Sequence, residues 1–371
     1  MSDKAAKICI GLMSGSSMDG LDIAVCEFNE QEAQTLSYRL LACETIPLPS
    51  DLILKIKNLP EGSARDIALC DAILGKWMGK VVREFITKNN IQADFIGSHG
   101  HTIFHEPGSG YTTQIGHPAH IVAETGLQVV GDFRMSDIAY GGQGAPMIPI
   151  AEKLLWPEYK EFVNLGGIVN IAFHKETEVI AYDVCAGNQL LNYLAEFKGL
   201  AFDRDGCLSQ SGEVISEVLN QYLNLKYFKL KAPKSLANDW VSREVIPIFN
   251  PKKFSVEDLL VTAMEASAIE LAKAMKEHSG LNRDSLMISG GGAHHPGWIA
   301  RINVQMQKNG FSDVYIPEPE IVDFKEAILI ALTGLLRLQG RPNFIKSVTG
   351  ARVDVSGGAI YLPAAIQDLI I

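Results

Sequence analysis

Apolar segments interrupted by small-residue turns recur along the chain. Near its start, apolar residues at 8–13 and 21–28 flank a short polar stretch, which predicts two strands joined by a turn. The same pattern returns at 162–173 around Gly166-Gly167, and a further apolar strand is predicted at 179–184. At 285–289 a short apolar segment leads directly into three glycines. The pattern therefore predicts two strand–turn–strand units and a later strand with a glycine-rich exit.

Helical spacing of apolar residues marks the segments between these strands. Residues 63–90 carry apolar side chains four positions apart, and residues 255–280 and 324–339 also predict helices. A strand at 94–102 follows the first of these helices. Strands that alternate with helices in this way indicate an α/β protein.

The first turn, Ser14 to Gly20, is rich in glycine and serine. Main-chain N–H groups in such a turn can form a concave site for an anion. Asp19 and Asp22 would repel a bare phosphate, so the pattern favours a phosphate bound with a divalent cation or a sugar hydroxyl. The alternative is an ordinary hairpin loop. No Gly-Lys-Ser/Thr follows, which excludes a Walker A loop, and the strand that comes next excludes a dinucleotide-binding fingerprint.

Ser98, His99 and His101 stand towards the end of the strand predicted at 94–102. Histidines two apart on a strand share a face, as a metal site would require. No nearby cysteine or suitably placed carboxylate completes a set of ligands. We therefore expect these side chains to line a cleft at the carboxyl end of the strand.

A segment rich in glycine and proline at 141–149 suits a crossover between domains. We expect one domain from residues 1–134 together with 345–371, and a second from 135–344. Arg134, just before the crossover, could hold an anionic group of a substrate through its planar guanidinium. The alternative is a surface ion pair with Asp132 or Asp137.

Asp183 closes the strand predicted at 179–184, and a helix is expected to start at 185–188. A carboxylate there either caps the helix or acts as a general base in a cleft. The helix N-terminus would keep this carboxylate ionised.

The composition of the chain mainly excludes certain partners and compartments. The 371 residues suffice for two domains, and the net charge of −10 argues against binding to nucleic acid or an anionic membrane. The six cysteines include no CxxC pair, which is typical of free thiols in a reducing compartment. The first apolar run is too short for a signal peptide, and the longest other run, 327–336, is too short to span a bilayer. We expect a cytoplasmic protein and leave a homodimer open.

Two domains that each open with strand–turn–strand follow the plan of the actin/hexokinase/Hsp70 class. In that class the two hairpins hold the phosphates of ATP from opposite sides of a cleft. By this analogy we expect an α/β protein of two ribonuclease H-like domains, with ATP in the interdomain cleft. The analogy alone predicts only an ATP-dependent phosphotransferase or an ATPase.

Ordered motifs over almost the whole length go further, and by them the chain resembles the anhydro-N-acetylmuramic acid kinases. The first motif is Gly11 to Asp22, with Ser16 where the family has Thr. The others are Gly97-Ser98-His99-Gly100, Asp132-Phe133-Arg134, Gly141 to Pro146, Asn164-Leu165-Gly166-Gly167, Ser289 to Ala293, Glu326-Ala327 and Val348-Thr349-Gly350-Ala351.

This resemblance implies an enzyme that uses ATP and Mg²⁺ on 1,6-anhydro-N-acetylmuramic acid, a sugar released by cell-wall turnover. It opens the anhydro ring with water and phosphorylates O6, which gives N-acetylmuramic acid 6-phosphate. Water attack on an acetal carbon needs a carboxylate base, and the departing O6 needs an in-line γ-phosphate.

The resemblance also assigns residues. Asp183 is the implied base, and the implied substrate contacts are Arg134, Glu326, Ser98 and His99. The implied ATP-binding residues are Gly15, Ser16, Ser17, Met18, Asp19, Gly20, Leu21, Asp22, Gly166, Gly167, Gly290, Gly291 and Gly292. We expect no metal tightly bound by the protein itself, and Mg²⁺ to accompany ATP near Asp19 and Asp22.

The chain departs from the family pattern near these residues. The usual Asp-Thr-Gly-Pro-Gly-Asn is here Asp183-Val184-Cys185-Ala186-Gly187-Asn188, which keeps the base and changes its turn. His101, His117 and His295 stand where the family has Gln, Asp and Asn. These departures leave open a kinase for a different anhydrosugar or amino sugar. A non-catalytic nucleotide or sugar sensor on the same fold is the other alternative.

Overall fold

The computed structural model describes residues 6–15, 18–30, 36–176, 178–232, 234–236, 239–279 and 286–364. Contacts divide the chain into two compact units. Unit 1 comprises Met1–Trp156 and Phe324–Ile371, and unit 2 comprises Pro157–Asp323. Ser16 and Ser17, both expected to bind ATP, lie outside the described residues.

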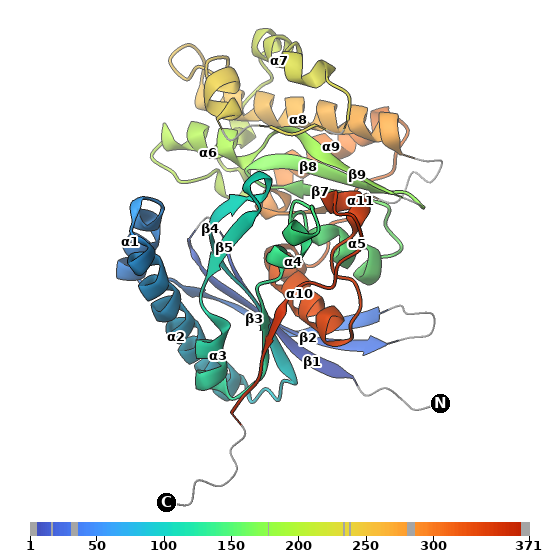
Figure 1. Ribbon diagram of the computed structural model, residues 1–371. Coiled ribbons are helices and arrows are strands. Elements are labelled where there is room, and N and C mark those ends of the chain that lie inside the picture. Colours follow the sequence, from blue (N-terminus) through green and yellow to red (C-terminus); the bar gives the residue numbers. More distant parts are fainter. Residues whose placement is uncertain are drawn as a thin grey trace, which may run out of the picture. The chain divides into compact units, whose positions relative to one another are not determined.

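Unit 1 is built on one mixed sheet (Figure 1). Its strands are β1 (Lys7–Ser14), β2 (Gly20–Glu30), β3 (Leu36–Pro47), β4 (Phe95–Glu106), β5 (Tyr111–Ile115), β6 (Val129–Gly131) and β11 (Ala359–Tyr361). The order is β11-β6-β4-β1-β2-β3, with β5 also paired to β4. Strands β1, β2 and β3 are antiparallel neighbours, while β4 is parallel to both β1 and β6. This order agrees with the ribonuclease H-like fold class expected from the sequence.

Helices cover both faces of this sheet. The helices of unit 1 are α1 (Ser50–Asn58), α2 (Ala64–Asn89), α3 (Pro118–Thr125), α4 (Arg134–Ala139), α5 (Ile148–Leu155), α10 (Pro319–Leu338), whose first five residues fall in unit 2, and α11 (Lys346–Thr349). The span of helix α2 confirms the prediction for 63–90. Ser63 and Asp66 form a capping box at its start. Its apolar side chains join those of α1, α3 and one sheet face in a single core that includes Ile10, Leu12 and Ile96.

The opposite face of β1 and β4 is covered by α10. Strand alternation places Gly11 and Gly97 on this face, away from Ile10, Leu12 and Ile96. A Cβ added to Gly11 would lie 1.8 Å from the Ala327 carbonyl oxygen, and one added to Gly97 would lie 2.5 Å from that of Ile330. The glycines that open two of the sequence motifs therefore let a helix backbone lie directly on the strands.

Unit 2 contains a second, smaller sheet. Its strands are β7 (Glu161–Leu165), β8 (Ile168–His174), β9 (Val179–Ala186) and β10 (Leu286–Ser289), in the order β10-β7-β8-β9. Its helices are α6 (Asn188–Glu196), α7 (Ser216–Leu223), α8 (Val256–His278) and α9 (Pro296–Lys308). Helix α8 confirms the prediction for 255–280, with Ser255 accepting a hydrogen bond at its start. Most of its residues are buried in the core of this unit.

The division by contacts differs from the boundaries expected at residues 134 and 344. The helices just after residue 134 pack within unit 1, α4 against β5 and α5 against β3. A buried ion pair of 3.0 Å between Glu152 on α5 and Lys325 on α10 joins two further parts of this unit. The Gly/Pro-rich segment therefore lies within unit 1 in this division, and the chain changes unit after Trp156.

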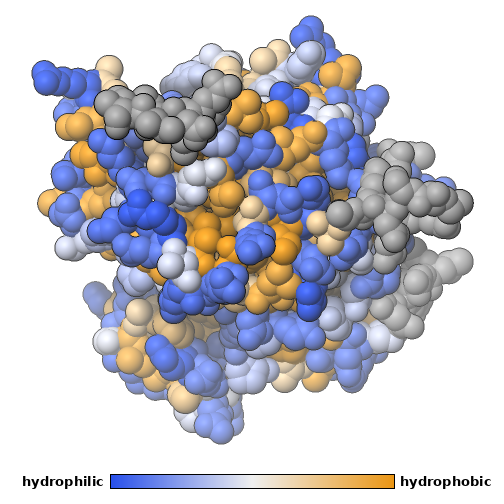
Figure 2. Space-filling view, turned by 90° about the horizontal axis from the view of Figure 1, so that it is seen from below, coloured by the Kyte–Doolittle hydropathy of each residue, from blue (hydrophilic) through white to orange (hydrophobic). Residues whose placement is uncertain are grey.

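The surface of the molecule carries both apolar and polar residues. On the face shown in Figure 2, apolar residues are interspersed with polar ones. In the described part of the chain, no helix has an apolar stretch of the length needed to span a bilayer.

Candidate active site

The turn between β1 and β2 begins at Ser14 and ends at Gly20. The Met18 N–H donates to the Gly15 carbonyl at 3.2 Å, and Met18 has a φ of 57°. Leu21, expected to contact ATP, has a side chain fully buried in the core, so only its main chain could do so. Asp19 is exposed, and Asp22 accepts a 2.6 Å hydrogen bond from the Thr45 hydroxyl.

His101 holds the start of this turn. Its Nδ1 lies 3.1 Å from the Ser14 hydroxyl, and both side chains are buried. The pairing register shifts between Leu12 and Ser14, so that β4 carries one extra residue at Gly100, whose φ is 73°. This bulge places His99 and His101 on opposite faces of β4.

The bulge corrects the expectation that these two histidines share a face. With their rings on opposite sides of the strand, they cannot hold one metal ion as an i, i+2 pair. Among the described residues, no group of three or more His, Cys, Asp or Glu side chains is arranged to hold a metal.

His99 instead positions Arg134. The Arg134 Nε donates to His99 Nε2 at 2.9 Å, and His99 Nδ1 then donates to the Gly100 carbonyl at 3.1 Å. Burial and the neighbouring guanidinium lower the pKa of His99 to about 3, which keeps the ring neutral. Arg134 Nη1 also donates to the Gly144 carbonyl at 2.9 Å. Strand alternation puts Ser98 on the other face, where its buried hydroxyl has no hydrogen-bond partner among the described residues.

Asp137 is the residue of this region that sequence reasoning missed. Its fully buried carboxylate accepts hydrogen bonds from the Gly144 N–H and the Thr349 hydroxyl, each 2.8 Å long. The alternative of a surface ion pair between Arg134 and Asp137 is wrong, because Asp137 has no exposed surface. The motif at Gly141 to Pro146 and the distant motif at Val348 to Ala351 both bond to this carboxylate, which fixes the helix that carries Arg134. The only hint in the sequence is the recurrence of glycine at 141, 142 and 144, which indicates a close approach of the main chain to another group. That group is Asp137, because a Cβ at Gly142 would lie 2.1 Å from its carboxylate.

Glu326 completes the charged cluster of unit 1. It lies near the start of the part of α10 that covers β1 and β4, and it interacts electrostatically with Asp22 and Arg134. Its side chain reaches solvent, but surrounding protein limits its hydration. This desolvation and the negative charge of Asp22 raise the pKa of Glu326, while Arg134 opposes that rise. The structure thus brings Asp22, Arg134 and Glu326 together with His99.

In unit 2, the Gly166-Gly167 turn meets the N-terminus of α6. The Gly166 carbonyl accepts from the Asn188 N–H at 2.8 Å, and the Gly167 carbonyl accepts from Gly187 and Gln189 at 3.0 and 3.1 Å. The Asn188 side chain donates to the Leu165 carbonyl at 3.1 Å. The turn carbonyls are therefore fixed by α6.

Asp183 is held on three sides. Its N–H donates to the Lys234 carbonyl at 3.1 Å, and its own carbonyl accepts from the Tyr227 hydroxyl at 2.5 Å. One carboxylate oxygen, Oδ2, accepts from the Leu236 N–H at 2.9 Å. The segment that follows α7 thus clamps the main chain and one side-chain oxygen of Asp183.

These contacts correct the expected surroundings of Asp183. The strand continues to Ala186 through a bulge at Val184, and Gly187, not Asp183, is the N-cap of α6. Asp183 therefore does not cap α6. Burial raises the pKa of the half-buried Asp183, and the Leu236 N–H partly offsets this rise.

The three glycines after β10 have different roles. Gly290 has a φ of 85°, and a Cβ there would lie 2.5 Å from the Asn164 side chain. A Cβ at Gly292 would lie 2.5 Å from the Trp298 ring. Gly291 has only the Asn188 side chain nearby, at 3.9 Å. Protein packing accounts for the outer two glycines, and only Gly291 leaves room for a ligand to approach.

Two of the departures from the family pattern are helix N-caps. His295 Nδ1 accepts from the Trp298 N–H at 3.1 Å at the start of α9, and its Nε2 lies 3.2 Å from Asp203. His117 likewise accepts from the Ala119 N–H at 3.2 Å at the start of α3. Asp and Asn are preferred N-caps. Each histidine therefore caps its helix through a ring nitrogen, at a position where Asp or Asn would also be a suitable cap.

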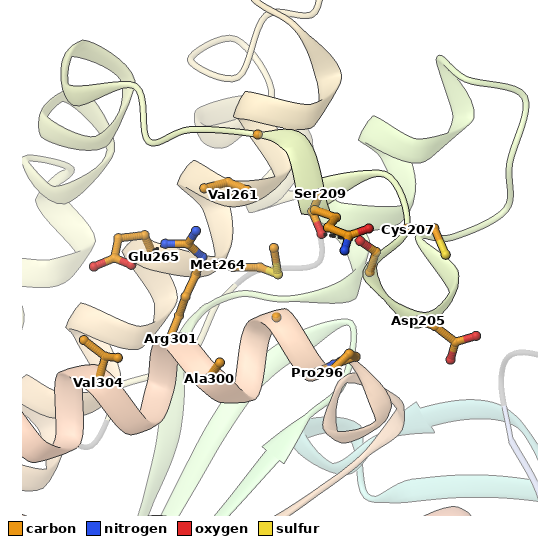
Figure 3. Close-up of a pocket in the computed structure, with 14 residues that line it drawn as sticks. Asp205, Cys207, Ser209, Val261, Met264, Glu265, Pro296, Ala300, Arg301 and Val304 are labelled. Atoms are coloured by element: carbon orange, nitrogen blue, oxygen red, sulfur yellow. Dashed lines mark hydrogen bonds and ion pairs between the residues drawn. The ribbon is translucent and has the colours of Figure 1, made fainter.

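A pocket of about 510 Å³ opens beside the glycine-rich exit of β10 (Figure 3). Helices α8 and α9 form two of its walls, and the loop at 205–212 forms another. His295 ties that loop to α9, since Asp203 in turn accepts from the Leu208 and Ser209 N–H groups. The pocket lies wholly within unit 2.

Comparisons with known proteins agree with the motifs. A sequence profile of the family described as anhydro-N-acetylmuramic acid kinase matches residues 7–363. The protein of that name from Pseudomonas syringae pv. syringae is 34% identical over 370 residues, covering 95% of this chain and 98% of the relative. The one from Hydrogenovibrio crunogenus is 31% identical, covering 98% and 100%. An activator of 2-hydroxyisocaproyl-CoA dehydratase from Clostridium difficile, solved with ADPNP, aligns over 90% of this chain and 96% of its own, at 14% identity and a TM-score of 0.45. That likeness is too distant to bear on the reaction.

Proposed function

The chain belongs to the anhydro-N-acetylmuramic acid kinase family, and we propose that it opens 1,6-anhydro-N-acetylmuramic acid with water and phosphorylates O6 from ATP. The observation that carries the chemistry is the clamped, half-buried Asp183 with its raised pKa. Such a carboxylate is a stronger base than an exposed one and is fixed in one orientation. We place the activity in the cytoplasm, because ATP is available there and because the free cysteines suit a reducing compartment.

Asp183 acts as the general base. With Oδ2 engaged by the Leu236 N–H, we assign the other carboxylate oxygen to the water that attacks the anomeric carbon. Asp183 takes a proton from this water while the bond from the anomeric carbon to O6 breaks. The oxygen of water becomes the C1 hydroxyl, and O6 keeps its bond to C6.

Unit 1 supplies the sugar-binding groups in this proposal. Arg134, whose guanidinium is oriented by neutral His99 and by Gly144, carries donors suited to an anionic group such as the lactyl carboxylate of the sugar. Glu326 can accept hydrogen bonds from sugar hydroxyls. Asp137 acts indirectly, by holding α4 and the loop around Gly144.

The nucleotide-binding groups are divided by unit. In unit 1 we assign the turn from Gly15 to Asp22, and in unit 2 Gly166-Gly167 and the turn around Gly291. Bound ATP supplies the γ-phosphoryl group for O6, and Mg²⁺ neutralises charge on the phosphates. The like charges of Asp22 and Glu326 lie close enough to raise the pKa of Glu326, so a cation near Asp19 and Asp22 fits this part of unit 1.

The first test follows the bridging oxygen. Substrate carrying ¹⁸O in its 1,6-anhydro bridge should give a phosphorylated product with the label between C6 and phosphorus, read by mass spectrometry and phosphorus NMR. Label at C1 would contradict the proposed bond cleavage. The same assay with levoglucosan serves as the control for substrate choice. Equal kcat/KM for both sugars would favour the alternative kinase for a different anhydrosugar.

The acid limb of the pH–rate profile should belong to Asp183. Only the ionised carboxylate accepts a proton, so kcat/KM should fall as the pH drops through the pKa of Asp183, which burial raises above its usual 3.8. His99, with a pKa of about 3, should stay neutral throughout this range. Profiles of wild type and of the residual activity of Asp183→Asn provide the check. A limb that persists unchanged in the variant would belong to Glu326 instead.

A further inference from the structure

The walls of the pocket in unit 2 are apolar on two sides. Val261 and Met264 face it from α8, and Ala300 and Val304 face it from α9 (Figure 3). Two opposed apolar walls suit a flat, aromatic ligand, and the pocket volume lies in the usual range for small-molecule sites.

One end of the pocket carries a charged pair. Figure 3 shows the Arg301 side chain extending from α9 towards Glu265 on α8. Arg301 Nη1 donates to Glu265 Oε2 at 2.9 Å, and Gln305 donates to Glu265 Oε1 at 2.5 Å. The Glu265 side chain is only 15% exposed. The two lining residues therefore present a fixed acceptor, the carboxylate of Glu265, beside a fixed donor, the guanidinium of Arg301.

The other end of the pocket lies beside the proposed nucleotide-binding turn. Pro296 and Gly297 line that end and follow the three glycines directly in sequence. From Pro296 to Arg301 the helix rises about 7.5 Å, at about 1.5 Å per residue. A nucleoside with its phosphates near Gly291 would therefore extend its base towards Glu265 and Arg301.

We propose that Glu265 and Arg301 recognise the edge of the nucleobase, and that Glu265 gives adenine preference over guanine. This inference rests on the proposed use of a nucleotide by unit 2. Adenine presents an amino donor beside the N7 acceptor, which matches a carboxylate beside a guanidinium. Guanine presents a carbonyl oxygen in place of that amino group, and this oxygen would face the Glu265 carboxylate unfavourably. N7 is common to both purines, so Arg301 contributes to affinity for both.

Calorimetric titration of the full chain with ADP and with GDP tests this assignment without requiring phosphoryl transfer. Glu265→Gln offers both a donor and an acceptor, so the ratio of GDP to ADP dissociation constants should fall by about ten- to a hundredfold. Arg301→Met should weaken both nucleotides and leave their ratio nearly unchanged. Glu257→Gln is the matched control, because Glu257 lies on the same helix but pairs with Lys198 away from the pocket, and it should change neither value.

The outcomes separate this assignment from the function itself. An unchanged ratio in Glu265→Gln, or equal losses for both nucleotides, would overturn the role of Glu265 while ATP-dependent phosphorylation by the wild type stood. Binding of neither nucleotide by the wild type would overturn both. If Glu265→Gln failed to fold, a Glu265→Asp variant, whose carboxylate reaches less far, would take its place. The assignment would also be overturned if that variant kept its preference for ADP and Arg301→Met bound both nucleotides with normal affinity.

Discussion

Replacing Asp183 with Asn should lower kcat by about 10²- to 10⁴-fold, the range that a general base typically contributes. The substitution keeps the size of the side chain and its acceptor for the Leu236 N–H, and it removes the ability to take a proton. The main-chain hydrogen bonds to Lys234 and Tyr227 do not involve the side chain and should remain. Steady-state kinetics with the anhydrosugar and ATP would measure the loss.

Binding measurements distinguish a base from a structural residue. Affinity for ADP and for the sugar should stay within a few fold in Asp183→Asn, because other residues are assigned to hold them. Asp239→Asn is a suitable control, since this exposed carboxylate of unit 2 pairs with Arg243 at the surface. Near wild-type turnover in Asp183→Asn would refute the role of base. Loss of nucleotide binding together with turnover would make Asp183 a structural residue.

Gly11→Ala should destabilise unit 1 by about 3 kcal/mol or more, at the upper end of the usual cost of overpacking. The added methyl carbon would overlap the Ala327 carbonyl oxygen and lie 2.8 Å from the Ala331 nitrogen, so the backbone of α10 must move. For a unit of this size, we expect the melting temperature to fall by roughly 10 °C. Displacing α10 also moves Glu326, so KM for the sugar should rise.

Gly108→Ala is the matched control for that variant. Gly108 lies in a one-turn 3-10 helix of unit 1 where a Cβ meets nothing within 4 Å, and its substitution should leave both melting temperature and KM nearly unchanged. Thermal unfolding followed by circular dichroism gives the comparison. Equal stability of Gly11→Ala and wild type would show that α10 does not lie on β1 as closely as described.

Regular periodicity carried the fold prediction. The apolar spacing predicted both α2 and α8 to within two residues of their ends. The repeated strand–turn–strand pattern predicted the pairs β1–β2 and β7–β8, whereas β3, β5, β6 and β11 of the first sheet were not predicted. Helix α10 begins five residues before its predicted start at 324, and its first turn carries Val322, which is buried in the core of unit 2.

Local pattern failed where one residue changes the register. A strict alternation along 94–102 puts His99 and His101 on one face, and the bulge at Gly100 puts them on two. A second bulge, at Val184, carries β9 beyond Asp183 and separates that carboxylate from the helix N-terminus. Bulges depend on pairing with a distant strand, so neither could be derived from the segment that contains it.

Polar contacts between residues far apart in the sequence could not be predicted from it either. Asp137 gains its partners from Gly144 and from Thr349, which is more than 200 positions away. His117 and His295 looked like changes to the substrate or nucleotide contacts, and the structure shows each capping a helix. These two departures therefore no longer weigh against the family's usual substrate.

The close contact of α10 with β1 and β4 also bears on the order in which the molecule can form during synthesis. Unit 2 is one continuous segment, whereas unit 1 needs Phe324–Ile371 to return to strands that end by Gly131. Until α10 and β11 leave the ribosome, the glycine face of β1 and β4 has no helix over it, and β6 lacks its outer partner. A nascent chain in which all of unit 2 has emerged but α10 has not would thus carry a finished unit 2 together with a half-covered sheet that has an open edge. Such partly formed sheets invite aggregation, so chaperone engagement should be strongest just before α10 emerges.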